Sequence, residues 1–301
     1  MSENNKNLAD IKDLSVSFMT DAGSIKAVED VNFTIPRKTV VGVVGESGSG
    51  KSVTARSIIK LLPETATTSG AVYLSKRDGS DSLDVLSLSG EQLREVRGSE
   101  AAMVFQEPNS VLNPVYTIGW QIEEGLRAHG MKDKKELRAK AINILKKVGI
   151  PDAETRVDYY PHQFSGGQKQ RIVIAMALVL NPGLILADEP TTALDVTVQA
   201  EILDLLRLAR DEFDASVLII THNMGVIADI ATRWSSCTAA TWSSRATWSR
   251  SSTIRRTTTP SDCWVPCRAS VRSWSCATAR ANRSSARPIG ANSRSPSRPR
   301  T

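Results

Sequence analysis

Residues 40–52 read VVGVVGESGSGKS, in which an apolar run leads directly into a glycine-rich segment. The segment fits the pattern G-x-x-x-x-G-K-[ST] of loops that bind phosphate groups between a strand and a helix. Its residues are Gly45, Glu46, Ser47, Gly48, Ser49, Gly50, Lys51 and Ser52. In such a loop, backbone N–H groups converge on phosphate oxygens, Lys51 reaches the β- and γ-phosphates, and Ser52 binds Mg²⁺. A plain glycine turn is the alternative, but it would not require the strand and helix patterns on either side.

Strand and helix patterns alternate on both sides of this loop, which predicts an α/β fold. Several short strand patterns lie within residues 11–39, before the loop. Single strand patterns cover residues 40–44, 71–74, 101–105, 184–187 and 216–221. Helix patterns cover residues 51–62, 91–96, 166–180, 196–210 and 223–230.

A helical pattern interrupts this alternation between about residues 107 and 165. One helix is predicted to start at Asp133 as its N-cap and to stop at Gly149. Its apolar face consists of Leu137, Ala141, Ile144, Leu145 and Val148. The sequence therefore predicts an α-helical subdomain inside an α/β domain of residues 1–231.

Two acids follow the apolar run of residues 184–187. They are Asp188 and Glu189. A carboxylate at a strand end can hold Mg²⁺ through water, and a second can polarise a water molecule that attacks a phosphate. Two acids after a strand are also common in polar loops. Their position downstream of a phosphate loop favours the catalytic interpretation.

A second anion-binding helix start is predicted at residues 164–168, which read FSGGQ. Ser165, Gly166, Gly167 and Gln168 open this helix. Because the chain contains both this motif and the phosphate loop, the sequence resembles ABC ATPases. The signature LSGGQ of that family completes the nucleotide site of a partner subunit in a head-to-tail dimer. The other landmarks of the family follow the expected order, and they are Gln106, Ala193-Leu194-Asp195 and Thr221-His222.

The resemblance implies a fold and a set of site residues. The fold is a P-loop ABC ATPase core, with a RecA-like sheet, added antiparallel strands and the helical subdomain. In that family Gly45–Ser52 is the Walker A motif, and the cofactors are ATP and Mg²⁺. Glu189 is implied as the catalytic carboxylate, His222 as the sensor of the γ-phosphate, and Asp195 as a residue of the dimer interface. Gln106 is implied to couple Mg²⁺ and water to the transporter contact.

Three further aromatic side chains could contribute to the site. Phe18 is the candidate for stacking on adenine, although an aromatic residue in a strand is more often part of the core. His129 and His162 are expected to be ordinary surface residues.

Residues 110–119 and 160–167 resemble the oligopeptide and dipeptide importer branch, and the match extends over about residues 9–231. This resemblance implies a subunit that couples ATP hydrolysis to peptide uptake. Its partners would be transmembrane permease subunits, a second ATPase subunit (a copy or a paralogue) and, indirectly, an extracytoplasmic solute-binding protein. It would lie peripherally on the cytoplasmic face of the inner membrane. Import of nickel or another solute, and a soluble ABC ATPase of repair or translation, remain alternatives.

Charge is divided unevenly along the chain. Residues 232–301 hold thirteen Arg against one Asp, so the +6 of the whole chain leaves residues 1–231 with a net charge of −6. An acidic body argues against a broad nucleic-acid surface, and no nucleic-acid partner is expected. The four Cys lack the paired spacing of a metal site. Neither a signal peptide nor a bilayer-spanning run is apparent.

The tail of residues 232–301 has no Leu, Phe, Tyr, Lys or Glu and no apolar period. Back-translation of residues 234–238 with TCN serine codons, shifted by two bases, gives Val followed by two apolar residues and then Tyr or His. The same shift turns residues 261–267 into a segment containing Leu-Leu-Gly, which is similar to the importer branch. We therefore expect that one base is lost, or an equivalent shift occurs, between the codons of Ala231 and Thr232. A disordered Ser/Arg-rich tail that binds RNA is the alternative.

Overall fold

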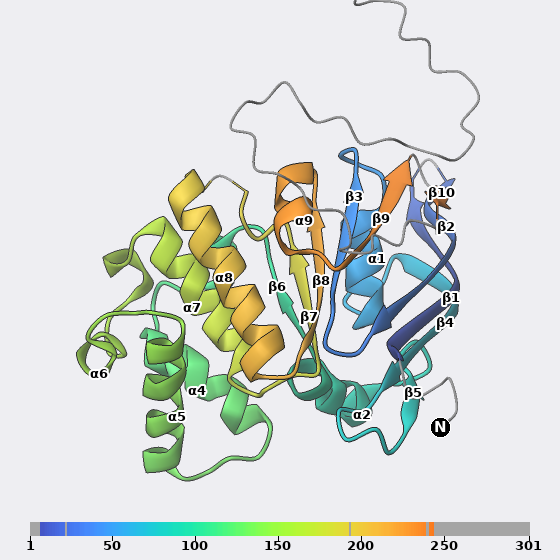
Figure 1. The fold of residues 1–301 in the computed structure, drawn as a ribbon. Coiled ribbons are helices and arrows are strands. Elements are labelled where there is room, and N and C mark those ends of the chain that lie inside the picture. Colours follow the sequence, from blue (N-terminus) through green and yellow to red (C-terminus); the bar gives the residue numbers. More distant parts are fainter. Residues whose placement is uncertain (1–6, 22, 193, 239–240, 244–301) are drawn as a thin grey trace, which may run out of the picture. The chain divides into compact units, whose positions relative to one another are not determined.

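The computed structural model describes residues 7–21, 23–192, 194–238 and 241–243 (Figure 1). Along the chain the strands are β1 (Asn7–Thr20), β2 (Gly23–Pro36), β3 (Val40–Gly45), β4 (Ala66–Ser75), β5 (Ser82–Asp84), β6 (Ala101–Val104), β7 (Leu184–Asp188), β8 (Ser216–Thr221), β9 (Arg233–Thr238) and β10 (Thr241–Ser243). The helices are α1 (Lys51–Ile58), α2 (Gly90–Glu95), the π-type turn η2 (Val96–Glu100), α3 (Pro108–Val111), α4 (Ile118–Ala128), α5 (Lys134–Lys147), α6 (Ala153–Arg156), the 3₁₀ turn η3 (Pro161–Gln163), α7 (Gly166–Leu178), α8 (Val196–Glu212) and α9 (Met224–Ile230).

A mainly parallel sheet runs through the middle of the described domain, with the strand order β10-β9-β3-β8-β7-β6. Only the β9–β10 pair is antiparallel. Side chains of β7 alternate between two cores, because Leu184 and Leu186 pack on one face of the sheet and Ile185 and Ala187 on the other. Burial on both faces explains why these strands read as continuous apolar runs.

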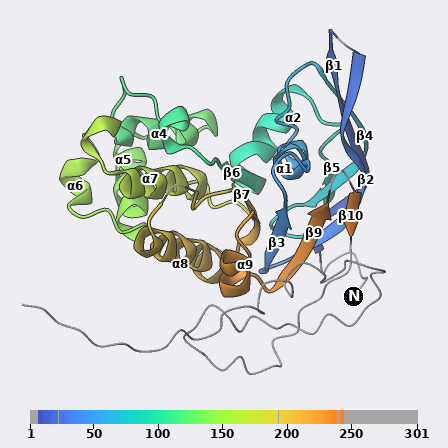
Figure 2. The same ribbon diagram turned by 90° about the horizontal axis from the view of Figure 1, so that it is seen from above.

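Each face of this sheet is covered by a different layer (Figures 1 and 2). The helices α7, α8 and α9 pack on one face, α4 and α5 pack on α7, and all five share one core with the sheet. The other face packs on α1 and on a four-stranded antiparallel sheet with the order β2-β1-β4-β5. The predicted fold class, a RecA-like sheet with added antiparallel strands and a helical subdomain, is confirmed.

The ends of the helices follow local chemistry. The Asp133 carboxylate accepts a hydrogen bond from Lys135 N (2.8 Å), as predicted for an N-cap, and Gly149 adopts a φ of +75° just after α5. In contrast, α1 ends at Ile58, although the pattern predicted a helix to residue 62. Lys60 takes a φ of +51°, and Leu61 N donates to Arg56 O (2.7 Å), which closes the last turn before Pro63 is reached.

Two strands follow Ala231 that the sequence pattern did not predict. β9 pairs in parallel with β3, in a register that runs from Val41 opposite Arg233 to Gly45 opposite Cys237. β10 then pairs back on β9. The remaining tail, residues 244–301, and with it the predicted Leu-Leu-Gly segment, lies outside the described residues.

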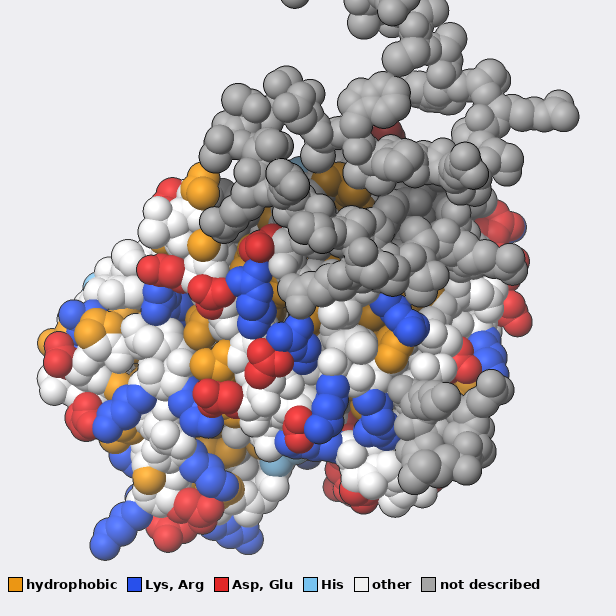
Figure 3. Space-filling model, in the orientation of Figure 1, with side chains coloured by type: hydrophobic (Ala, Val, Ile, Leu, Met, Phe, Trp, Pro, Cys, Tyr) orange, Lys and Arg blue, Asp and Glu red, His pale blue; other side chains and the backbone are white. Residues whose placement is uncertain are grey.

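Charges of both signs lie side by side over the described helices on the face drawn in Figure 3. Ion pairs join Lys147 to Glu212 (3.5 Å) and Arg207 to Asp229 (2.7 Å). None of the helices in the described ranges combines the length and the apolar character needed to span a bilayer.

The helical subdomain depends on a buried apolar centre, which makes its stability testable. Leu145 of α5 is fully buried in that core. We expect Leu145→Ala to lower the free energy of unfolding by about 2–5 kcal/mol, because it removes buried methyl groups and leaves a cavity. Urea denaturation followed by circular dichroism measures this loss, with the exposed Lys135→Ala in the same helix as control. Equal stability of the two variants would contradict the assigned packing.

Candidate nucleotide-binding site

The phosphate loop joins β3 to α1, as the sequence predicted. Lys51 is the first residue of α1, and its side chain is almost fully buried. Its Nζ donates hydrogen bonds to Gly45 O (2.8 Å), Glu46 O (2.6 Å) and Ser49 Oγ (3.3 Å). The ammonium group therefore lies in the middle of the loop, where it can meet phosphate oxygens.

Gly50 holds the loop against the antiparallel sheet. Its φ is +85°, and a Cβ at this position would lie 2.7 Å from Ala27 O and 2.9 Å from Val28 Cγ2. Only glycine combines this backbone conformation with so close an approach. The loop is thus seated directly on β2, which also brings Ala27 to the edge of the site.

Ser52 and Asp188 meet at the ends of α1 and β7. Ser52 Oγ donates to Asp188 Oδ1 over 2.7 Å, and the Asp188 side chain is nearly buried. Burial raises the pKa of the Asp188 carboxyl, whereas the Ser52 hydrogen bond and the nearby Arg56 guanidinium oppose that rise. Hydroxyl and carboxylate oxygens are the ligands that Mg²⁺ prefers. Because the fold places the Ser52 hydroxyl and the Asp188 carboxylate side by side, this pair fits a magnesium ion.

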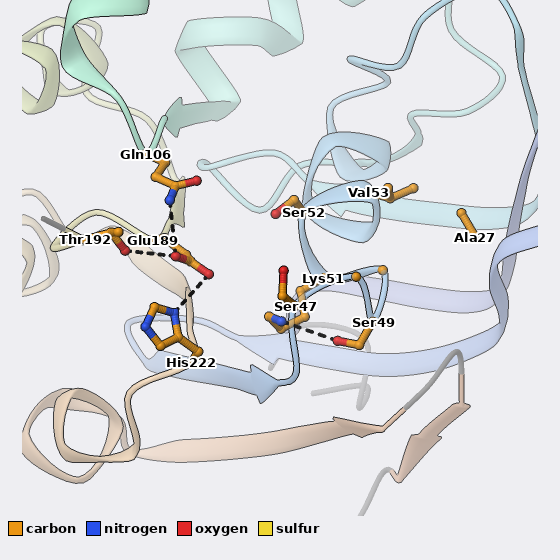
Figure 4. Close-up of a pocket in the computed structure, with 12 residues that line it drawn as sticks. Ala27, Ser47, Ser49, Lys51, Ser52, Val53, Gln106, Glu189, Thr192 and His222 are labelled. Atoms are coloured by element: carbon orange, nitrogen blue, oxygen red, sulfur yellow. Dashed lines mark hydrogen bonds and ion pairs between the residues drawn. The ribbon is translucent and has the colours of Figure 1, made fainter.

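Glu189 is the meeting point of three other side chains (Figure 4). Its Oε2 accepts hydrogen bonds from Thr192 Oγ1 (2.8 Å) and Gln106 Nε2 (3.4 Å), and its Oε1 lies 3.3 Å from His222 Nδ1. The backbone of Glu189 has a φ of +47°, which is uncommon for a residue other than glycine. Backbone strain of this kind concentrates at functional sites.

A cavity of about 730 Å³ lies between the loop and this acidic group. It is open toward solvent, and Figure 4 shows Gln106, Glu189, Thr192 and His222 on one side of it and the phosphate loop on the other. Its lining residues are Ala27, Ser47, Gly48, Ser49, Gly50, Lys51, Ser52, Val53, Gln106, Glu189, Thr192 and His222. An anion-binding loop thus faces a carboxylate that can polarise water.

Residues 28–192, more than half of the chain, match the model of the ABC transporter family. The chain belongs to the ABC transporter family. With the phosphate loop and the acidic strand end both in place, this ABC cassette is an ATPase.

Similar proteins include Brucella proteins that are named for peptide import. A protein of Brucella abortus (strain 2308) named "Putative peptide import ATP-binding protein" is 50% identical over 226 residues, which are 75% of this chain and 67% of that protein. A protein of the same designation from Brucella melitensis is 48% identical over 228 residues, with the same coverage.

Solved ABC cassettes share the fold. The ATP-binding cassette MJ0796, a dimer in a post-hydrolysis state with ADP and phosphate, is 31% identical with a TM-score of 0.66, covering 77% of this chain and 95% of that one. The cbiO1 protein from Clostridium perfringens, part of the ABC transporter complex cbiONQ, is 27% identical with a TM-score of 0.64, covering 79% of this chain and 87% of that one.

The residues predicted to form the signature motif and the dimer interface do not line the cavity of this ABC cassette. Ser165 is the N-cap of α7: its Oγ accepts from Gln168 N (3.3 Å), and Gln168 Oε1 accepts from Ser165 N (3.1 Å). Gly167 packs against α8, because a Cβ there would lie 2.7 Å from Val198 Cγ1. Asp195 caps α8 by accepting from Val198 N (3.0 Å).

Phe18, a predicted site residue, lies away from the cavity, and Thr192, which was not predicted, lines it. Phe18 lies on β1 opposite Ile25 and Ala66, half-buried against the core, and is not among the cavity-lining residues. Its role on adenine stays a prediction. Thr192, which the sequence reasoning missed, lines the cavity and contacts Glu189. A hydroxyl three residues after an acid, in a turn that follows a strand, is the signal that could have found it.

Proposed function

We propose that this chain is the ATP-hydrolysing subunit of an importer that takes up peptides, working on the cytoplasmic face of the membrane with a pair of permease subunits. Its 50% identity over 226 residues to a relative that bears a peptide import name is the observation that carries the substrate class. The phosphate loop, the Ser52–Asp188 pair and Glu189 supply the chemistry of hydrolysis. An extracytoplasmic solute-binding protein would deliver the peptide to the permeases.

The proposed division of labour follows from the contacts in the cavity. The loop amides and Lys51 bind the phosphates, and Ser52, Asp188 and Gln106 would hold Mg²⁺. The metal would neutralise charge on the phosphate oxygens. Glu189 polarises the attacking water. His222 Nδ1 lies 3.3 Å from Glu189 Oε1 and lines the same cavity, where the imidazole can approach the terminal phosphate.

We propose that the signature residues act on a second ATPase subunit. Ser165, Gly166, Gly167, Gln168 and Asp195 lie outside this cavity, at the exposed starts of α7 and α8. Helix starts of this kind favour anions. The dimeric structure of the MJ0796 cassette agrees with a site that is shared between two subunits.

The substrate class can be tested in the organism that carries this gene. Disruption of the gene is expected to abolish uptake of labelled dipeptides and oligopeptides, while uptake of free amino acids continues. Nickel uptake, measured in the same cells, distinguishes the other solute class. Normal peptide uptake after disruption would refute the proposed substrate.

We also propose that the ABC cassette proper spans residues 1–231 and that the 70 residues after it are read in a shifted frame. The backbone of β9 occupies a place between β3 and β10 in the parallel sheet. The other parallel strands β3, β7 and β8 consist largely of buried apolar residues. The present frame instead reads RWSSCT over β9. The alternative frame supplies valine and other apolar residues instead.

A further inference from the structure

Thr192 is bound to Glu189 twice, through its backbone and through its side chain. Its backbone N–H donates to Glu189 O (3.2 Å), and its Oγ1 donates to Glu189 Oε2 (2.8 Å). Residues 189–192 therefore form a closed turn directly after β7. The side-chain contact is the shortest of the three that the described residues make to this carboxylate.

The other two contacts come from distant parts of the chain and are longer. Gln106 follows β6 and reaches Oε2 over 3.4 Å, and His222 follows β8 with a side chain that is 61% exposed. The backbone N–H of Glu189 donates to Ile220 O (2.9 Å) of β8, but the side chains of Gln106 and His222 belong to other segments than the turn that holds Glu189. The hydroxyl of Thr192 moves together with Glu189, because both belong to one turn.

We propose that Thr192 is a positioning residue for the catalytic carboxylate. Its hydroxyl fixes Oε2 and leaves Oε1 directed at the side of His222, the orientation that Figure 4 shows. A charge-assisted hydrogen bond to one oxygen restricts rotation of the whole carboxylate. The proposal rests on the catalytic role assigned above to Glu189.

Thr192→Val removes the hydroxyl at nearly constant volume, and Thr192→Ser retains it. We expect Thr192→Val to lower the kcat of ATP hydrolysis about 10- to 100-fold, the effect of a displacement on the order of 1 Å. The Kd for a fluorescent ATP analogue stays unchanged, because the hydrogen bond of the hydroxyl is to Glu189 and not to the phosphate loop, and the unfolding midpoint falls by no more than the loss of one hydrogen bond implies. Thr192→Ser keeps most of the activity. Thr67→Val, on exposed β4, is the matched control.

A double-mutant cycle with Glu189→Gln tests whether Thr192 acts through Glu189. Thr192→Val is expected to cause no further loss in single-turnover hydrolysis once Glu189 is Gln. The same fold loss in both backgrounds, or full activity of Thr192→Val while Glu189→Gln is inactive, would overturn the positioning role alone. Full activity of Glu189→Gln would instead remove Glu189 from catalysis. A parallel fall in ATP affinity and in the unfolding midpoint would show that Thr192 only supports the fold.

Discussion

Glu189→Gln is expected to bind ATP as tightly as the parent chain and to hydrolyse it about 10²- to 10⁴-fold more slowly, the usual contribution of a general base. The amide has nearly the same shape as the carboxylate and leaves the phosphate loop and the Ser52–Asp188 pair untouched. It cannot, however, accept the proton of an attacking water. The loss should therefore appear in kcat and not in the affinity for nucleotide.

Phosphate release measures turnover, and equilibrium binding of a fluorescent ATP analogue measures affinity. Glu64→Gln is the control, because it makes the same chemical change at an exposed position that no described ion pair uses. Unchanged hydrolysis by Glu189→Gln would assign the base to another group. A loss of nucleotide binding would show that the substitution damages the site as a whole.

Local patterns predicted most of the scaffold around this site. The phosphate loop, the apolar strands and the cap at Asp133 depend on residues that are neighbours in the sequence, and the structure has each of them. The early end of α1 was not predicted, because it depends on the left-handed conformation of Lys60, which is not a glycine. Strand β9 was not predicted either, because its present sequence lacks the apolar residues typical of a buried parallel strand.

The convergence on Glu189 could be predicted only in outline. Gln106, Glu189 and His222 each follow a strand of one parallel sheet, and the carboxyl ends of such strands meet at one edge. Motif order thus indicated that these side chains would be near one another. The contact of Thr192 with Glu189 depends on the rotation of two side chains within a turn, which spacing does not specify.

At Ser165 and Asp195 the sequence alone does not distinguish helix capping from a role in the nucleotide site. Each was predicted as a residue of the nucleotide site or the dimer interface, and each caps a helix through its side chain. The two roles are compatible, because an N-cap lies where unpaired N–H groups of the first turn attract an anion. A pattern that starts a helix and a pattern that binds phosphate therefore coincide at these positions.

Restoring one base between the codons of Ala231 and Thr232 is expected to stabilise the ABC cassette by about 5 kcal/mol or more, if three or four apolar side chains become buried at about 1.5–3 kcal/mol each. The gain is expected because β9 lies against β3, whose valines are buried on both faces of the sheet. A chain truncated after residue 243 is the control for removal of the tail. Urea denaturation of the three proteins, with the soluble yield of each, measures the difference.

The truncated chain separates two causes of instability. If the tail merely interferes, removing residues 244–301 should stabilise the protein as much as restoring the frame does. If β9 lacks the residues that the sheet requires, only the restored frame should gain, because truncation leaves RWSSCT beside β3. Equal stability of the present and restored chains would contradict the shifted frame and favour a genuine Arg-rich tail. Salt-dependent RNA binding would then be the property to measure.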